Sequence, residues 1–123
     1  MKLHLTQAAG LHLITAYEDD YVAVNREKYP GNVLVLPEKV IVDWTQADSN
    51  SLSAESLQPL HALDVEVILL GTGPCLRFPP PELLHAFLCR GVGIEVMDRP
   101  AACRTYNILA SEGRKVAAAL LLA

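Results

Sequence analysis

The chain has 123 residues, of which 51% are hydrophobic and 20% are charged, and its formal net charge is −4. This length suits one domain with a core of its own, so we expect a single α/β domain over residues 1–123. The negative charge and the 6% of aromatic residues argue against a nucleic-acid partner, because phosphates need a cationic face and bases need stacking platforms.

The cysteines and the apolar runs indicate the cellular compartment in which the protein is expected to work. Cys75, Cys89 and Cys103 are odd in number and lack CxxC spacing, which favours a reducing environment over a disulfide framework. Polar residues interrupt the first twenty positions, unlike a signal peptide, and the apolar run 116–123 is too short to span a bilayer. We therefore expect a soluble, cytoplasmic protein without a transmembrane segment.

The first third of the chain predicts strands only. Residues 11–17 and 21–25 are apolar and β-rich, and the acidic residues 18–20 form a tight turn between them. A second turn at 29–32 leads into a strand over 33–36. Pro37 stops that strand, which resumes over 40–44.

The remainder alternates between helices and strands. Helices are expected over 54–63, where Pro59 should kink or shorten the helix, over 79–90, and from Pro100 to Gly113. Strands are expected over 65–71, 93–97 and 115–122, and this alternation is typical of a largely parallel sheet flanked by helices. The residues predicted to be buried in these strands are Val67, Leu69, Ile94, Val96, Val116, Ala118 and Leu120.

Three separated motifs carry a family resemblance. "LLGTG" (69–73), "GIEVMD" (93–98) and "AACRTYNIL" with "EGR" and "VAAAL" (101–120) resemble a small α/β family of unknown biochemical activity. That family includes a mitochondrial assembly factor for respiratory complex I. The resemblance implies a three-layer domain around a mixed five-stranded sheet, to which the first third would add antiparallel strands. Arg99 and Pro100 stand where the family has small or hydroxyl residues, so Asp98 is expected to cap the helix.

The "GTGP" segment follows a buried strand, at the sheet edge where open α/β folds bind ligands. Gly71, Thr72 and Gly73 could bring backbone N–H groups together around an anion. The segment lacks the third glycine of a dinucleotide fingerprint and the Lys of a P-loop. The alternative is a plain turn between strand and loop.

The polar helix 100–112 also has two interpretations. Helical spacing places Ala102, Tyr106, Leu109 and Ala110 on the face that packs on the sheet, and Arg104, Asn107, Ile108 and Ser111 opposite. Arg104, Thr105, Tyr106 and Asn107 could form a recognition surface, led by the planar guanidinium. Alternatively this is a solvated face on which Thr105 and Asn107 satisfy backbone groups.

No motif identifies a metal, a cofactor or a catalytic group. His85 and Cys89 have i,i+4 spacing, but two ligands do not make a zinc site. Cys103 lies at the edge of the apolar face and is expected to be an inert thiol. We therefore expect neither a cofactor nor a catalytic residue.

Two functions remain open. The family resemblance implies a non-catalytic interaction protein, similar to an assembly factor, with a protein partner that includes membrane-associated components of a respiratory complex. The alternative is a small-molecule or anion-binding protein or an enzyme. Its pocket would lie between the 71–74 loop and the 100–112 helix, because these loops follow neighbouring strands.

Overall fold

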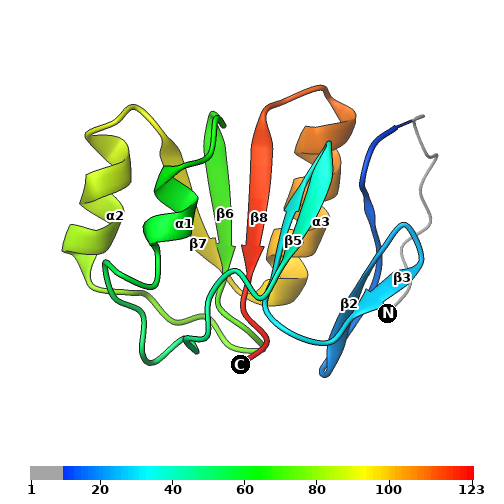
Figure 1. Ribbon diagram of the computed structural model, residues 1–123, viewed down its shortest axis with the longest axis horizontal. Coiled ribbons are helices and arrows are strands. Elements are labelled where there is room, and N and C mark those ends of the chain that lie inside the picture. Colours follow the sequence, from blue (N-terminus) through cyan, green and yellow to red (C-terminus); the bar gives the residue numbers. More distant parts are fainter. Residues whose placement is uncertain (1–9) are drawn as a thin grey trace.

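The computed structural model describes residues 10–123, which form two sheets and three helices (Figure 1). Residues 1–9, part of the segment compared above with a signal peptide, lie outside the described residues. The smaller sheet is antiparallel, with β1 (Ile14–Glu18), β2 (Tyr21–Val24) and β3 (Glu27–Tyr29) in that order.

The larger sheet has five strands in the order β5–β4–β8–β6–β7. Its strands are β4 (Val33–Leu36), β5 (Lys39–Val42), β6 (Val67–Gly71), β7 (Gly93–Met97) and β8 (Val116–Leu120). β6 is parallel to β7 and β8, whereas β4 is antiparallel to β5 and β8. The mixed five-stranded sheet and the additional N-terminal antiparallel strands confirm the predicted fold class.

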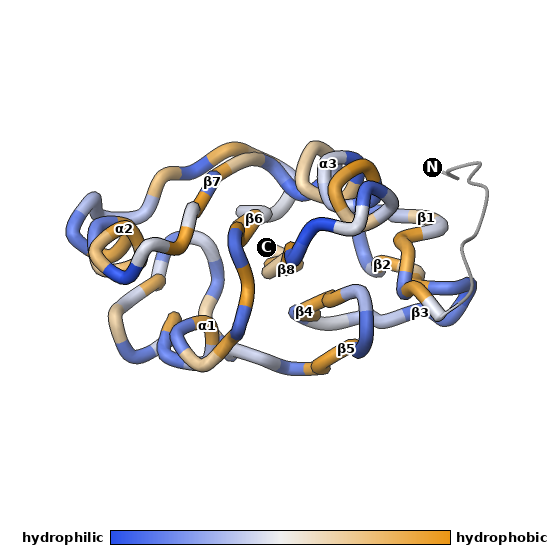
Figure 2. The backbone as a smooth tube through the Cα atoms, turned by 90° about the horizontal axis from the view of Figure 1, so that it is seen from above, coloured by the Kyte–Doolittle hydropathy of each residue, from blue (hydrophilic) through white to orange (hydrophobic). Residues whose placement is uncertain are grey.

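Helices cover both faces of the larger sheet. Figure 2 shows α3 (Arg99–Ser111) on one face, and α1 (Gln58–His61) and α2 (Pro81–Leu88) on the other. Successive residues of β6 therefore serve two cores: Leu69 packs on the α3 side, and Ile68 and Leu70 pack on the α1 and α2 side. The small sheet packs against α3 through β1 and completes the core on that side.

Four local predictions need correction. β3 was missed, because its three residues have no apolar alternation. Residues 39–42 form the second arm of a β4–β5 hairpin rather than a resumption of the same strand. The helix expected over 54–63 is only the single turn of α1. Proline is tolerated in the first turn of a helix but not in its interior, so α1 begins at Gln58, directly before Pro59. The strand expected over 11–17 begins at Ile14.

The core prediction is confirmed for the central strands. Leu69, Val116, Ala118 and Leu120 are at most 1% exposed. Val67, at the start of β6, is only half-buried, as are Ile94 and Val96. The last two lie in β7, which is an edge strand and so lacks a neighbour on one side.

Candidate interaction surface around helix α3

Helix α3 begins at a side-chain cap supplied by its own sequence. The Asp98 carboxylate accepts a hydrogen bond from the backbone N–H of Ala101 at 2.8 Å, and Pro100 occupies the first turn. This confirms the expected cap, and it places a negative charge at the end of the helix where an anion would otherwise bind.

Gly71 lets the start of α3 lie directly on the sheet. A Cβ atom at Gly71 would be 2.9 Å from Leu120 Cδ2, 3.1 Å from the Cβ of Ala102 and 3.3 Å from the Cα of Arg99. These separations are shorter than ordinary van der Waals contacts, so only glycine permits this approach. At Gly71 itself, protein atoms therefore leave no room for a side chain between β6 and α3.

Thr72 and Gly73 also serve the loop itself. The Thr72 hydroxyl donates to the carbonyl oxygen of Cys75 at 2.8 Å and accepts from the backbone N–H of Arg77 at 3.0 Å. Gly73 has a positive φ, 89°, and its carbonyl oxygen accepts from the N–H of Arg99 at 2.7 Å. The "GTG" segment thus joins the carboxyl end of β6 to the start of α3, as the topology argument expected.

Arg99 is a buried cation that the sequence reasoning noticed only as a departure from the family pattern. Its side chain is 2% exposed, and its guanidinium donates to the carbonyl oxygens of Leu122 at 2.7 Å and Glu18 at 2.6 Å. Its Nε has no hydrogen-bond partner among the described residues. Arg99 therefore connects the β1–β2 turn to the residues after β8; an arginine directly before the helix proline was the only available signal.

Tyr106 and Asn107 fasten α3 to β1. The amide of Asn107 accepts from the N–H of Ile14 and donates to the carbonyl of the same residue, both at 2.8 Å. The Tyr106 hydroxyl donates to the carbonyl oxygen of His12 at 2.7 Å. The prediction that Asn107 lies on a face remote from the packed one is wrong, because β1 covers that side of the helix. Burial also raises the pKa of the Tyr106 phenol.

Cys103 is a second buried group in this helix. It is 0% exposed, and burial raises the pKa of its thiol from 9.0 to about 12, although Arg99 and Arg104 act in the opposite direction. A thiol of such high pKa has almost no thiolate at neutral pH, so it is a poor nucleophile. The expectation of an inert thiol is in keeping with this environment.

Fewer residues of α3 are accessible to solvent than the sequence predicted. Arg104 is exposed and donates to the Tyr17 hydroxyl at 2.9 Å, Ile108 is 60% exposed, and Thr105 is half-buried. Arg104 and Ile108 are one turn apart, so they share a face. We call Arg104, Thr105 and Ile108 the α3 face. Of the seven sequence-predicted residues, only Arg104 and Thr105 belong to it, and the other five are buried.

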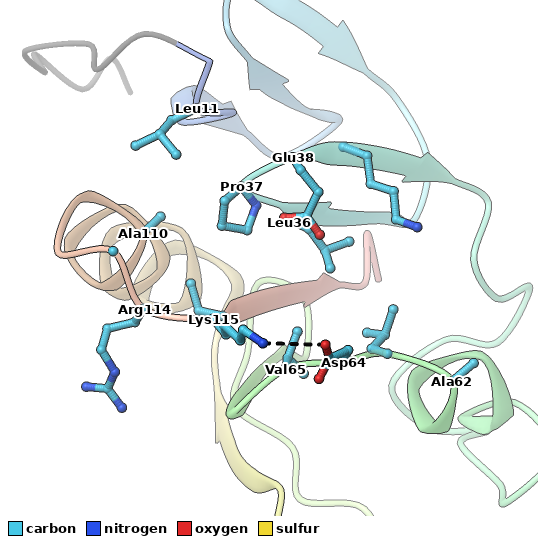
Figure 3. Close-up of a pocket in the computed structure, with 14 residues that line it drawn as sticks. Leu11, Leu36, Pro37, Glu38, Ala62, Asp64, Val65, Ala110, Arg114 and Lys115 are labelled. Carbon is cyan, nitrogen blue, oxygen red and sulfur yellow. Dashed lines mark hydrogen bonds and ion pairs between the residues drawn. The ribbon is translucent and has the colours of Figure 1, made fainter.

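Two further features lie outside the α3 face. The Cys89 Sγ is 3.2 Å from His85 Nε2, but the described residues contain no group of three or more side chains able to hold a metal ion. A cavity of about 570 Å³ lies at the opposite end of the sheet, near the end of α3 (Figure 3). Its walls include Leu36, Val65 and Ala110, and Lys115 and Asp64 form an ion pair of 3.4 Å at its edge.

Known proteins share this arrangement of sheets and helices. A family model described as "Protein of unknown function (DUF498/DUF598)" matches residues 14–121. The chain belongs to this family. Because the matched range runs from β1 to the residue after β8, both sheets and all three helices are part of the family domain.

Relatives of known name or structure cover almost the whole chain. A Xenopus tropicalis protein named NADH dehydrogenase [ubiquinone] 1 alpha subcomplex assembly factor 3 is 34% identical over 93% of this chain and 63% of its own length. The crystal structure of a Bordetella parapertussis protein is 38% identical, with a TM-score of 0.83 over 94% of this chain and 98% of that one. A Bordetella pertussis protein described as a Mth938-like domain is 36% identical, with a TM-score of 0.79 over 98% of this chain and 92% of that one.

The chain thus spans less than two thirds of the length of the Xenopus assembly factor. The similarity confirms the family and the α/β fold inferred from the three motifs. No helix in residues 10–123 has the length and apolar character needed to cross a bilayer.

Proposed function

We propose that this chain is a non-catalytic protein-interaction domain with a role like that of an assembly factor. The observation that carries the proposal is the similarity to assembly factor 3 over 93% of the chain. The geometry around α3 supports it: the buried residues of the family motifs fix the position of the helix, and the α3 face remains open to a partner.

The partner that this role implies is a protein, and by analogy with the relatives it includes membrane-associated components of a respiratory complex. Arg104 offers several N–H donors on a helix surface, and Ile108 adds an exposed apolar side chain. This combination suits a partner surface that presents carboxylates beside a small apolar patch. We further infer that the protein works in the cytoplasm, in support of which Cys75 and Cys89 are exposed, free thiols.

Crosslinking in a native bacterial lysate tests the proposal. We expect the wild-type chain to capture a defined protein, and Arg104→Ala and Ile108→Ser to capture much less of it per folded molecule. Leu88→Ser is the matched control for Ile108→Ser, because Leu88 is 58% exposed on α2, on the other side of the large sheet from α3. Arg104→Ala should change the free energy of unfolding by no more than about 0.5 kcal/mol, as is usual for exposed positions.

Two results would contradict the proposed interaction function or the role of Arg104 in it. If no protein is captured, and a thermal-shift panel of nucleotides, phosphates and carboxylates raises the melting temperature, the chain binds a small molecule instead. A strongly lowered melting temperature for Arg104→Ala, with capture by the folded fraction intact, would make Arg104 a structural residue.

A further inference from the structure

The outer edge of β7 leaves backbone hydrogen-bonding groups open. The N–H of Gly93 donates to Glu66 O and the carbonyl of Met97 accepts from Thr72 N, both at 2.9 Å, and the strands pair in parallel register. Bonding residues alternate along a parallel strand, so Gly93, Glu95 and Met97 bond to β6. The N–H and C=O groups of Ile94 and Val96 therefore point away from β6, and no described residue pairs with them.

On one face of β7 the side chains favour the addition of a strand. On the other face they limit which strand sequence can be added. Ile94 and Val96 are half-buried beside the core that α2 covers, so a new strand could extend this apolar surface. Glu95 points to the other face, is exposed, and forms no ion pair with a described residue. The edge thus carries a single uncompensated negative charge at its centre.

The loop after β6 carries exposed apolar side chains near the carboxyl end of the sheet. The Thr72 hydroxyl, which donates to Cys75 O, is also 3.4 Å from Met97 O, so the loop after β6 lies at the carboxyl end of β7. In this loop, Leu76 is 51% and Phe78 is 70% exposed. Phe78 lines a cavity with Ser49 and Leu52, so these side chains are not counted as part of the β7 edge. An open strand edge with an apolar face is itself typical of a binding site for an extended segment.

The other strand edges in the described part of the chain are better protected. β1 is covered by α3, where the Asn107 side chain binds both the N–H and the C=O of Ile14. β3 has only three residues, and two of them, Glu27 and Lys28, are exposed and charged. β5 starts at the exposed Lys39, and Asp43 directly after it has a φ of 50°, which turns the chain out of the strand conformation. Short, charged or bent edges disfavour the addition of a strand, whereas β7 has five residues and one charge.

We propose that the edge of β7 binds an extended segment of a protein partner that places a basic residue opposite Glu95 and apolar residues on either side of it. The proposal rests on the proposed interaction function and specifies a second contact of that partner. A second copy of this chain fits less well. Pairing the whole of β7 with itself in antiparallel register sets Glu95 directly opposite the Glu95 of the other copy, and like charges there are destabilising.

Synthetic strand peptides test the proposal without knowledge of the partner. Two peptides of one length would carry a Val-Lys-Val or a Val-Glu-Val centre, and amide NMR shifts of the full chain would report weak binding. We expect shifts centred on Ile94 and Val96, with about a two- to fivefold preference for the lysine peptide. Glu95→Lys should reverse this preference.

A backbone variant separates strand addition from side-chain contact. Val96→Pro removes an N–H that points outward, so the ladder with β6 is kept. Val96→Ala removes more of the side chain than Val96→Pro does but keeps the N–H, so it is a stringent control for side-chain contact. We expect Val96→Ala to bind and Val96→Pro, with its fold verified by circular dichroism, to lose binding.

Each contrary outcome overturns the proposal. Equal binding by the two variants of Val96, or an unchanged preference in Glu95→Lys, would show that no strand is added here. A wild-type dimer that Val96→Pro dissociates would make a second copy the occupant. These results are independent of capture through the α3 face, so the interaction function can stand if the β7 site fails, and peptide binding can stand if the lysate yields no partner.

Discussion

At the scale of single residues, the buried polar side chains around α3 bind other parts of the same chain. Arg99 binds two carbonyl oxygens from distant parts of the chain, and Asn107 binds both backbone groups of Ile14. A buried polar group with good hydrogen bonds costs little, whereas removal of one partner leaves the other unsatisfied. In helix α3 itself, Tyr106 and Asn107 are thus explained by contacts within the protein, without any ligand.

Gly73 gives a prediction about close approach. Its φ is 89°, and a Cβ there would be 3.0 Å from the backbone carbon of Ala123. Gly113 has a similar φ, 80°, but a Cβ there would have no atom within 4 Å. Gly113→Ala should therefore cost only the conformational strain, about 1–2 kcal/mol, and Gly73→Ala should cost clearly more.

Urea unfolding of the two variants measures this difference. Equal losses would mean that the backbone near Ala123 moves aside freely and that Gly73 is needed for its conformation alone. A glycine in this turn permits a positive φ, but the sequence could not predict this contact, because it joins residues fifty positions apart.

At the scale of strands and helices, the hydrophobic pattern predicted where the elements lie better than how deeply each is buried. The runs 65–71, 93–97 and 115–122 all became strands, but β6 and β8 are central and β7 is at the edge. Whether a strand lies at the edge or at the centre of the sheet depends on the order in which the strands pair. The local apolar content of a strand does not encode that order. The short α1 has a local cause, since Ser53 and Ser56 bond to each other's backbone and hold a turn where helix was expected.

The difference between a central and an edge strand is testable. Leu69→Ala should lower the free energy of unfolding by about 2–5 kcal/mol, because Leu69 is 1% exposed between β7 and β8. Ile94→Ala should cost clearly less, since Ile94 is half-buried and solvent already reaches part of its surface. Chemical denaturation of both variants compares them, and an equal loss would contradict an open edge at β7.

At the scale of the whole molecule, the attachment of the small sheet to α3 was the part that sequence reasoning could least predict. Hydrophobic periodicity assigned the apolar face of α3 to the larger sheet, which it does contact. It gave no sign that β1 would cover another side of the helix and bury Asn107. That contact joins residues 93 positions apart through a hydrogen bond between polar atoms. An amphipathic pattern reflects only the positions of apolar side chains, so it could not predict this contact.

Asn107→Ala should loosen this attachment. The N–H and C=O of Ile14 would lose their partners inside the protein, at a cost of about 1–3 kcal/mol. Hydrogen exchange of the amides of β2 should accelerate more than exchange in β6 and β8. Ser111→Ala, on the same helix but exposed, should leave both unchanged. Uniform acceleration across all strands would show that the two sheets unfold as one unit.

The central position of β8 has a consequence for the order in which the molecule is built. β8 lies between β4 and β6, although it follows every other strand in the chain (Figure 1). During synthesis from the N-terminus, β4 and β6 emerge first and have no direct contact that pairs them. The hairpins β1–β2 and β4–β5 can form early, but their apolar faces stay exposed until residues 116–120 leave the ribosome. Until β8 emerges, the five-stranded sheet is therefore incomplete, and the two cores close in a step that depends on this strand.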